Sequence, residues 1–433
     1  MEENQVHIPD GWKSYVGNEV LKVQGGYAFK SSDYKDEGVL LVRIGNVGNG
    51  NFVFKDVIYI PKRFQITHSN FQLWKGDVLM GLTGDLGKIC ILKDGDFPYF
   101  LNQRVGKFVP TDKIDNDYLF YLISSSFVQS KFDAFFAGGA QKNISPKQIE
   151  SIDYVIPKSK TEQIQIARIL SKVDEAIAQT EQLIAKYTRI KTGLMQDLLT
   201  KGIDEHGNIR SETTHEFKDS PLGRIPKEWE DVSVSSLCKE IVVGIVIRPT
   251  QYYKEEGIPM LRSQNVKVDG ITMNDLVYMS PSENDKLAKS RLTENDVVSV
   301  RTGYPGTSAV VSKAIAGCNC IDLVISRVNQ SLLNPYFLAL WLNSEMGRKQ
   351  ILNHQSGIAQ QHFNVGQMKE LKIVRITMNE QLTILSKVKG LNRRIANFDL
   401  HLSKLQSLKT GLMQDLLSGK VRVNHLIKET ASV

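Results

Sequence analysis

Apolar residues recur with a helical period along two long stretches of the chain. One ladder of such positions runs from Ile166 to Leu198 and the other from Ile384 to Leu416. Successive positions lie 4, 3, 4, 3, 4, 3, 3, 4 and 4 residues apart in both ladders. An alternation of threes and fours is the stripe of a coiled coil. The pattern therefore predicts a long amphipathic helix around each ladder.

The two predicted helices are copies of one another. The nonapeptide KTGLMQDLL stands at Lys191–Leu199 and returns at Lys409–Leu417, with unlike sequence between. A helix of roughly 40 residues is about 60 Å long, and it cannot bury its apolar stripe against itself. We expect the two helices to pack antiparallel against each other and to leave surface for further helices. The alternative is that each stripe packs onto its own globular domain.

Both helices are predicted to begin and end in the same way. Ser159-x-x-Glu162 and Thr377-x-x-Glu380 each have the form of a capping box, in which the hydroxyl and the carboxylate bind the free amides of the first turn. A glycine shortly after each helix supplies a stop, because glycine readily adopts the left-handed conformation of a helix end. The predicted stops are Gly202 and Gly419.

The duplication extends to the globular sequence before each helix. Matched segments keep the motifs IP-x-x-W, R-x-x-N, T-G-x-x-G and G-x-x-Q, while the residues between them differ. Short apolar runs such as VLLVRI and DVLMGL are typical of strands, and Asn116–Phe132 is typical of a helix. A period this long indicates two duplicated domains. The matched pairs are 8–12 with 225–229, 34–47 with 253–266, 76–87 with 295–306, and 138–149 with 357–368.

The predicted fold class is α+β. Two duplicated globular α/β modules are separated by two long helices, which pack as an antiparallel coiled coil. The segment between the halves is polar and lacks apolar periodicity, so we expect it to be a linker. In chain order the predicted parts are a first module at 1–158, a first long helix at 159–201, a linker at 202–224, a second module at 225–376, a second long helix at 377–419 and a C-terminal tail at 420–433.

Composition narrows the class of protein. A hydrophobic content of 41% and a charged content of 23% are typical of a soluble globular chain. No apolar run has the length of a membrane span, and the N-terminus lacks the features of a secretory signal. Four cysteines do not suggest a disulfide framework in a chain of 433 residues, so we expect a cytoplasmic protein. The net charge of +7 mildly favours a polyanionic partner.

The sequence offers no active site of its own. Gly81–Ile89 hints at a phosphate loop, but its glycine spacing is wrong and it lacks the required Ser or Thr. Pro9-Asp10 with Asp33-Tyr34-Lys35 matches a loose nuclease pattern, which the second half does not repeat. Cys318-x-Cys320 has no second ligand pair nearby and predicts two buried thiols. We expect no catalytic residue, no metal site and no cofactor on this chain.

In this order, and twice over, the motifs resemble the specificity subunits of type I restriction–modification systems. The resemblance covers nearly the whole chain, and the Glu-Gln helix start and the repeated KTGLMQDLL complete it. The sequence departs from the family's usual double-proline turn before each helix, where IPKSKTEQ has one proline and RITMNEQ has none. The angle at which each helix leaves its module is therefore left open.

The resemblance implies a non-catalytic DNA-binding subunit. Each module would be a target recognition domain that reads one half of a bipartite site in double-stranded DNA, and unlike modules imply an asymmetric site. The two helices would hold the modules apart and dock two methyltransferase subunits, to which restriction subunits add. S-adenosylmethionine, ATP and Mg²⁺ would bind to these partners only. The alternatives are a structural adapter whose modules bind protein or another ligand, and an autonomous methyltransferase or nuclease.

Polar residues in the loops of the repeat are the candidates for DNA contact, because Arg and Lys recognise guanine, Asn and Gln recognise adenine, and phosphate contacts give salt-dependent affinity. Residues that both halves share, such as Arg43 and Arg262, would alternatively be scaffold or turn formers. Positions that differ, such as Leu82 against Arg301, are better candidates for sequence specificity. The candidates in the first half are Arg43, Asn46, Thr83, Lys88, Gln141, Lys142 and Asn143. Those in the second half are Arg262, Gln264, Asn265, Arg301, Thr302, Tyr304, Gln360, Gln361 and His362.

The apolar ladders are the candidate surface for subunit assembly. Sequence identity is kept at the helix ends, where two equivalent partners would dock, while the modules diverge. The candidate assembly residues are Ile177, Ile184, Leu194, Leu198, Ile395, Leu402, Leu412 and Leu416.

Overall fold

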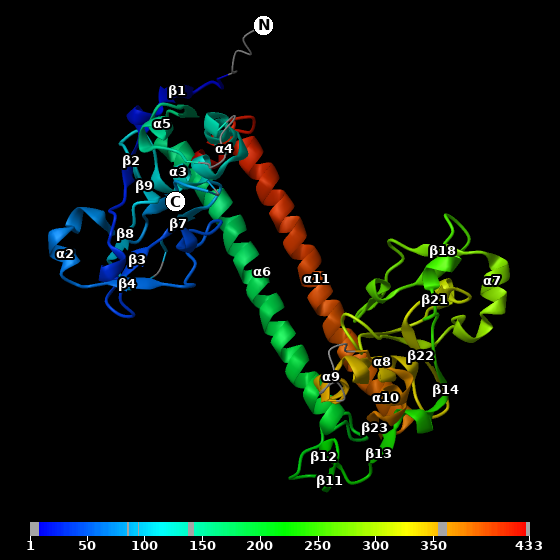
Figure 1. Cartoon of the computed structure of the whole chain (residues 1–433). Coiled ribbons are helices and arrows are strands. Elements are labelled where there is room, and N and C mark those ends of the chain that lie inside the picture. The colour runs from blue at the N-terminus through cyan, green and yellow to red at the C-terminus, as the bar shows by residue number, and fades with distance from the viewer. Residues whose placement is uncertain (1–7, 85, 94, 137–142, 354–361, 430–433) are drawn as a thin grey trace. The chain divides into compact units, whose positions relative to one another are not determined.

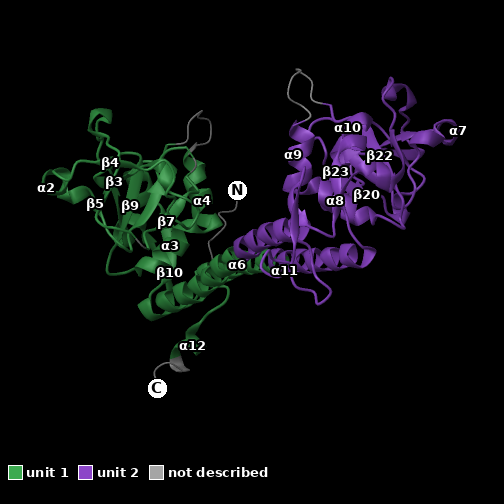
Figure 2. Cartoon of the chain, turned by 90° about the horizontal axis from the view of Figure 1, so that it is seen from below, with its two compact units in different colours: residues 1–182, 400–433 green, residues 183–399 purple. Residues whose placement is uncertain are grey.

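The long helices of the chain are each shared between two compact units. A computed structural model describes residues 8–84, 86–93, 95–136, 143–353 and 362–429 (Figure 1). Unit 1 comprises residues 1–182 and 400–433, and unit 2 comprises residues 183–399 (Figure 2). The long helices are α6 (Lys160–Thr200) and α11 (Met378–Leu417). Unit 1 therefore holds the start of α6 and the end of α11, whereas unit 2 holds the end of α6 and the start of α11.

Unit 1 is built on two small sheets. Besides its parts of α6 and α11, its helices and strands are β1 (Trp12–Val16), α1 (Gly17–Val20), β2 (Leu21–Gly25), β3 (Val39–Val42), β4 (Ile58–Ile60), α2 (Phe64–Thr67), β5 (Gln72–Leu73), β6 (Val78–Gly81), β7 (Ile89–Ile91), β8 (Tyr99–Leu101), β9 (Val105–Pro110), α3 (Asn116–Ser124), α4 (Ser126–Asp133), α5 (Pro146–Glu150), β10 (Asp153–Pro157) and α12 (Asn424–Glu429). One sheet has the order β2-β9-β6-β7 and the other β4-β3-β8-β5, while β1 pairs with β10. All strand pairs are antiparallel except β3 with β8, which is parallel.

Unit 2 repeats this plan. Its further elements are β11 (Phe217–Ser220), β12 (Gly223–Pro226), β13 (Glu230–Ser233), β14 (Cys238–Val243), β15 (Ile258–Leu261), β16 (Val266–Lys267), β17 (Gly270–Ile271), β18 (Val277–Met279), α7 (Pro281–Lys286), β19 (Val297–Val300), β20 (Ser308–Val310), β21 (Asn319–Cys320), β22 (Leu323–Val328), α8 (Pro335–Asn343), α9 (Glu345–Asn353), α10 (Val365–Glu370) and β23 (Lys372–Arg375). The sheet order β14-β22-β19-β20 corresponds to β2-β9-β6-β7 of unit 1. The parallel pair of β15 with β21 corresponds to β3 with β8, which confirms the duplication predicted from the motifs.

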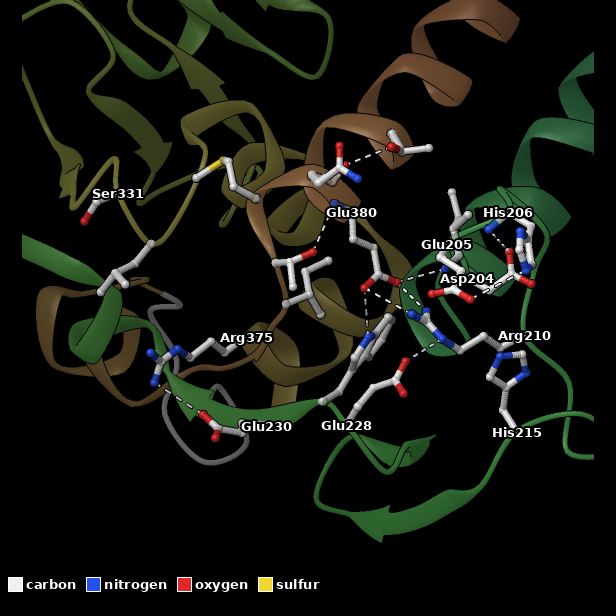
Figure 3. A pocket seen from close by; sticks show the side chains of 18 residues that line it. Asp204, Glu205, His206, Arg210, His215, Glu228, Glu230, Ser331, Arg375 and Glu380 are labelled. Atoms are coloured by element: carbon white, nitrogen blue, oxygen red, sulfur yellow. Dashed lines mark hydrogen bonds and ion pairs between the residues drawn. The ribbon is translucent and has the colours of Figure 1, made fainter.

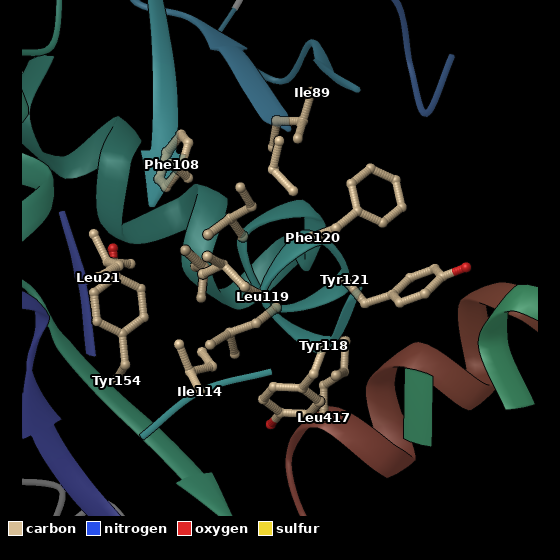
Figure 4. Close-up of a cluster of buried hydrophobic side chains, with 14 of the residues drawn as sticks. Leu21, Ile89, Phe108, Ile114, Tyr118, Leu119, Phe120, Tyr121, Tyr154 and Leu417 are labelled. Atoms are coloured by element: carbon tan, nitrogen blue, oxygen red, sulfur yellow. The ribbon is translucent and has the colours of Figure 1, made fainter. Parts of the chain in front are cut away.

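The hydrophobic core of unit 1 joins its globular part to both long helices. Tyr118 of α3 and Leu417 of α11 belong to one buried cluster (Figure 4). The same cluster contains Ile166 and Leu170 of α6 and Leu416 of α11. The start of α6 thus packs beside the end of α11. An ion pair between Asp174 and Lys409, with a nitrogen–oxygen distance of 2.7 Å, links the same parts of the two helices.

The core of unit 2 repeats the arrangement with the helices exchanged. Leu198 and Leu199 at the end of α6 share a buried cluster with Ile384 and Val388 at the start of α11. In each unit the end of one helix meets the start of the other, so the two helices pack antiparallel, as predicted. In each unit, both helices also pack on the globular part, since residues of all three belong to one buried cluster.

The predicted capping boxes form only in part. The backbone N–H of Glu162 donates to the Ser159 hydroxyl at 3.4 Å, and that of Glu380 donates to the Thr377 hydroxyl at 3.3 Å. A capping box also requires the glutamate carboxylate to accept from the backbone N–H of the N-cap residue, and neither carboxylate does so here. Both are buried and each binds an arginine instead, because a buried carboxylate needs a counter-charge more than a second backbone donor.

The ion pair in unit 2 closes the junction between α6 and α11. Arg210 Nη1 lies 2.5 Å from Glu380 Oε1, which also accepts from the Ile203 backbone N–H at 2.9 Å (Figure 3). Trp229 Nε1 donates to the other carboxylate oxygen at 3.3 Å. These groups line a cavity of about 960 Å³ whose charged walls are largely paired with one another, as the bond between Arg375 and Glu230 shows.

The polar segment at 202–224 is more ordered than the linker expected from the sequence. Ile203 and Arg210 are buried in unit 2, and Phe217 pairs with Pro226 in the hairpin of β11 with β12. Helical periodicity does not reveal this order, because the segment is held by one isolated apolar residue, Ile203, and by Arg210, whose partner Glu380 lies far away in the sequence. The segment is therefore part of unit 2.

The junction in unit 1 has the same form. Arg422, which follows the end of α11, places Nε 2.6 Å and Nη2 2.9 Å from the two oxygens of Glu162. The predicted stops Gly202 and Gly419 both adopt positive φ, +68° and +72°. A Cβ at Gly202 would lie 2.2 Å from the Trp229 ring. The tryptophan of IP-x-x-W therefore packs where the opposite helix ends.

The two free thiols at β21, those of Cys318 and Cys320, are buried as predicted. Cys318 is 7% exposed and Cys320 is fully buried, and burial raises the pKa of both thiols. Within the described ranges, no group of three or more His, Cys, Asp or Glu side chains could hold a metal ion. No helix in the described part of the chain has the length and hydrophobicity needed to cross a membrane.

Candidate nucleic-acid interface

Some of the candidate DNA-contact residues lie where the two parallel strands of each unit end: Arg43 and Asn46 in unit 1, and Arg262, Gln264 and Asn265 in unit 2. Leu41 pairs with Phe100 and Val42 with Leu101 across β3 and β8, so the loops after these strands lie side by side. Those loops are 43–46 and 102–104. In unit 2 the corresponding loops, after β15 and β21, are 262–265 and 321–322. The carboxyl ends of parallel strands are a common place for ligand sites, since loops from separate strands converge there.

Asn46 and Asn265 form the same turn in the two units. Asn46 Oδ1 accepts from the backbone N–H of Arg43 at 3.0 Å, and its Nδ2 donates to the carbonyls of Val53 and Lys55, both at 3.1 Å. Asn265 makes the corresponding bonds in unit 2. Both asparagines are only 1% exposed. Their amides are committed to the turn, which favours the scaffold alternative for this pair.

The shared arginines are held in place by a backbone carbonyl. Arg43 Nη2 donates to the Asp56 carbonyl at 2.6 Å, and Arg262 Nη2 donates to the Asp275 carbonyl at 2.5 Å. Both aspartates have φ of +51°, a left-handed conformation that turns the carbonyl toward the arginine. A guanidinium has five N–H donors, so this single bond positions the side chain and leaves donors for a ligand.

A cavity of about 400 Å³ opens beside Arg43 in unit 1. Sequence reasoning did not select four residues of its wall, which are Tyr34, Lys55, Gln103 and Arg104. Gln103 and Arg104 follow β8, and only the parallel pairing of β3 with β8 brings them next to the Arg43 turn. Because residues 43–46 and 102–104 are far apart in the sequence, no sequence motif indicates that they lie together.

Unit 2 places a charged network at the equivalent edge. Arg301 Nη1 lies 2.6 Å from Asp322 Oδ1, and Thr302 Oγ1 donates to Asp322 Oδ2 at 2.9 Å. Thr302 Oγ1 also lies 2.8 Å from His362 Nδ1, and Arg301 Nε donates to the Phe363 carbonyl at 3.2 Å. Asp322, which sequence reasoning missed, thus binds the adjacent candidates Arg301 and Thr302, and Thr302 in turn contacts His362 from a separate motif.

The other candidates are less closely grouped. Thr83 pairs with Asn143 through an antiparallel bridge, and Asn143 is exposed. Tyr304 is 83% exposed in the T-G-x-x-G loop of unit 2. Lys88 is half-buried, and Gln264 Nε2 lies 3.4 Å from the Asp275 carbonyl. Outside the described residues lie Gln141, Lys142, Gln360 and Gln361.

Four of the eight candidate assembly residues pack into the chain's own cores. Leu198 is fully buried and Leu416 is 2% exposed, so neither can contact a partner in this structure. Leu194 and Leu412 are half-buried against the same cores. The ladder of apolar positions therefore marks contacts within the chain at its ends. Also half-buried are Ile177, Ile184, Ile395 and Leu402.

Several apolar side chains on the helices are exposed, and four of them form two equivalent pairs. Ile164 on α6 and Leu382 on α11 are each 50% exposed, and they occupy the same place in the repeat. Ile190 and Leu408, one residue before the nonapeptide in each helix, are 42% and 50% exposed. Ile190 and Leu408 thus belong to the apolar ladder and are nevertheless exposed, and with Ile164 and Leu382 they give each helix an equivalent exposed apolar surface.

Comparison with known proteins shows which proteins the chain resembles. Residues 9–189 match a family model described as the type I restriction modification DNA specificity domain. The putative MjaX specificity subunit of Methanocaldococcus jannaschii, a type I restriction enzyme subunit, is 25% identical over 96% of this chain and 95% of its own length. The chain is thus similar to type I specificity subunits over nearly its whole length. The EcoBI specificity subunit of Escherichia coli is 21% identical to it, over 96% of the chain and 86% of the relative.

Partial and structural matches agree with this family. The MjaVIII specificity subunit of Methanocaldococcus jannaschii is 31% identical, but the match spans 45% of this chain and 46% of the relative. A crystal structure of a type I S subunit from M. genitalium matches with a TM-score of 0.55 at 14% identity, over 96% of this chain and 97% of the other. A chain from a study of type I complex assembly and conformational transition matches with a TM-score of 0.59 at 16% identity, over 96% and 100%. These two likenesses extend the shared fold to both units.

Proposed function

We propose that this chain is a type I specificity subunit that reads an asymmetric, bipartite site in double-stranded DNA, one half with each unit. The observation that supports this proposal is a repeated framework with unlike side chains at its loop edge. The two units share the arginine turn and the parallel strand pair, yet Leu82 of unit 1 corresponds to Arg301, and Gln103-Arg104 stand where unit 2 has Asp322. A shared frame positions the loops, and different polar groups read different bases.

The duplicated helices are proposed to dock two methyltransferase subunits, to which restriction subunits add. The exposed pairs Ile164 with Leu382 and Ile190 with Leu408 give two equivalent apolar surfaces, as two equivalent partners require. Under this proposal the chain itself does not catalyse. S-adenosylmethionine, ATP and Mg²⁺ bind to the partner subunits.

Glycines within the repeated nonapeptide support the same docking surface. Gly193 and Gly411 lie inside exposed helix, where glycine is about 0.8–1.0 kcal/mol less favourable than alanine. A Cβ at either position would meet no atom of the described residues within 4 Å. No contact in the described part of the chain thus requires a glycine at either position. A partner helix that approaches closely at both positions supplies the reason.

Binding of DNA in two separate half-sites tests the main proposal. The purified chain, together with its methyltransferase partner, is incubated with a pool of randomised duplexes, and the retained duplexes are sequenced. We expect two short preferred sequences separated by an unselected spacer, with binding that falls steeply as salt rises. Retention that is independent of sequence and salt would contradict the proposal and favour a structural adapter.

Substitutions in one unit sharpen the same experiment. Arg301→Gln in unit 2 removes a side chain held by Asp322 at the loop edge. We expect it to relax the preference in one half-site by about 1–3 kcal/mol and to leave the other half-site unchanged. Arg224→Gln, which changes an exposed cation in the β11–β12 hairpin, is the matched control. Equal effects on both half-sites would argue against one half-site per unit.

A further inference from the structure

The cavity beside Arg43 in unit 1 gathers three cationic side chains. Arg43, Lys55 and Arg104 all line it, together with Asp56. Arg43 is bound to the Asp56 backbone carbonyl and not to its carboxylate. Lys55 and Arg104 are exposed, and neither side chain has a hydrogen bond or ion pair with any described residue. Three cations and one carboxylate, that of Asp56, therefore line this cavity, which leaves it with an excess of positive charge.

Unit 2 does not repeat this charge. Its counterpart of Lys55 is Asn274, since the carbonyls of both residues accept from the asparagine of the shared turn. The loop after β21 is shorter than the loop after β8 and presents Asp322 in place of Gln103-Arg104. The Asp322 carboxylate is already bound to Arg301 and Thr302. Of the cations around the unit 1 cavity, unit 2 retains only the shared arginine.

Converging cations suit a phosphate better than a base edge. Reading a base in the major groove takes one side chain that projects into the groove, whereas these side chains line one concave surface. Like charges around one cavity repel each other, and an anion bound there removes the repulsion. Double-stranded DNA carries one negative charge per roughly 1.7 Å of its axis. The shared Arg43 fits a sequence-independent contact of this kind.

We propose that this cavity binds backbone phosphates of the DNA half-site read by unit 1. Arg43, Lys55 and Arg104 supply the contacts. Because unit 2 has one equivalent cation in place of three, unit 1 carries the larger share of the salt-dependent affinity. The inference rests on the proposed DNA binding and assigns to the two units unequal parts in it.

Salt dependence of binding measures the phosphate contacts directly. Lys55→Gln and Arg104→Gln are made in the full chain, and the affinity of its complex with the methyltransferase partner for a selected duplex is measured from 50 to 200 mM salt. Each lost phosphate contact lowers the slope of log affinity against log salt by about 0.9, or about 3.5-fold less loss of affinity over this range. The same change is expected for randomised duplexes. Asn274→Lys in unit 2 is expected to steepen the slope.

The controls separate this inference from the function on which it rests. Arg63→Gln removes an exposed cation of unit 1 that is paired with Asp33 outside the cavity, and it should leave the slope unchanged. A salt-dependent wild-type complex whose slope is unaltered by both cavity variants would overturn the phosphate site alone. A changed base preference at constant slope would overturn it as well and make Arg104 a base reader. A wild-type complex with no salt-dependent DNA binding would overturn both proposals.

Discussion

Glu162 and Glu380 occupy the same place in the two copies of the repeat, and both bury a carboxylate at the start of a long helix. Each binds an arginine that follows the end of the other helix, Arg422 in unit 1 and Arg210 in unit 2. Breaking a buried ion pair by removing one partner leaves an uncompensated charge and costs about 3–5 kcal/mol. These pairs therefore hold the two helix ends together at single residues.

Arg210→Ala should strongly destabilise unit 2. The side chains of Arg210 and Glu380 are 8% and 9% exposed, so the variant leaves a carboxylate buried without its counter-charge. We expect the free energy of unfolding of unit 2 to fall by about 3–5 kcal/mol. Urea denaturation followed by the fluorescence of Trp229, which contacts the same carboxylate, measures the change.

Two variants serve as controls for this prediction. Lys227→Ala removes a partner of Glu216 in an exposed pair, and it should leave the unfolding midpoint unchanged. The double variant Arg210→Met with Glu380→Leu removes both charges, and it should be less destabilised than Arg210→Ala. A single variant as stable as the wild type would show that solvent reaches the carboxylate and that the pair contributes little.

The sequence allowed the Glu-Gln helix start to be recognised as a repeated motif, but not its partners. Glu380 and Arg210 are 170 residues apart, and Glu162 and Arg422 are 260 apart. Capping rules describe contacts within four residues and so predicted a local role for both carboxylates. The adjacent Gln163 likewise binds the backbone of Lys113 and Pro157, contacts that no local pattern indicates.

At the scale of elements, the repeated nonapeptide has one face buried in the core of a unit and one face exposed to solvent. Leu198 and Leu199 pack into the core of unit 2, and Leu416 and Leu417 pack into that of unit 1. Gly193 faces outward. The identity of the two copies thus reflects two equivalent junctions within the chain, and the proposed docking of partners concerns the outer face.

Gly193→Ala combined with Gly411→Ala should separate stability from assembly. Alanine in the middle of an exposed helix is about 0.8–1.0 kcal/mol more favourable than glycine, and no described atom lies within 4 Å of either new Cβ. We therefore expect a higher unfolding temperature for the chain and weaker binding of the methyltransferase subunits. Differential scanning calorimetry and size-exclusion chromatography with the partner measure the two effects.

Gly390→Ala is the matched control for these glycines. Gly390 also lies within exposed α11 with nothing near its Cβ, but it stands outside the repeated nonapeptide. This variant should gain stability and keep full assembly. Assembly that survives the double Gly193 and Gly411 variant would count against a close approach of a partner at the nonapeptide.

Elements could be predicted from the sequence better than their pairing. The observed helix at Lys160–Thr200 agrees with the apolar ladder, because the ladder records which residues are buried along one helix face. Alternation also indicated strands such as Val39–Val42, but it carries no information on neighbours. The parallel pairing of β3 with β8, which creates the unit 1 cavity, depends on contacts between segments far apart in the sequence. Arg104 was therefore missed.

At the scale of the whole molecule, the domain boundaries predicted from the sequence differ from those of the compact units. The repeat placed the whole of 377–419 after the second module, whereas packing assigns the end of α11 to unit 1. Leu416, Leu417 and Val423 complete the core of unit 1 although they lie beyond the second module in sequence. Periodicity shows that a face is buried but not what covers it, so the sequence could not assign each helix end to a unit.

A chain that ends at Leu417 should lose stability in unit 1 and not in unit 2. The truncation removes Arg422, the partner of the buried Glu162, and Val423, which is 2% exposed in the core of unit 1. Loss of about 3 kcal/mol lowers an unfolding temperature by roughly 6–12 °C in a unit of this size. Differential scanning calorimetry should show one transition moving and a second staying in place.

The Arg210→Ala variant identifies the two transitions, because it is expected to lower the one that the truncation leaves unchanged. A chain that ends at Glu429 keeps Arg422 and Val423 and should melt like the full chain. Two transitions that respond separately would show that each buried ion pair stabilises only the unit that contains it. A single transition that both changes lower equally would contradict this view, since it would mean that the shared helices make the two units unfold together.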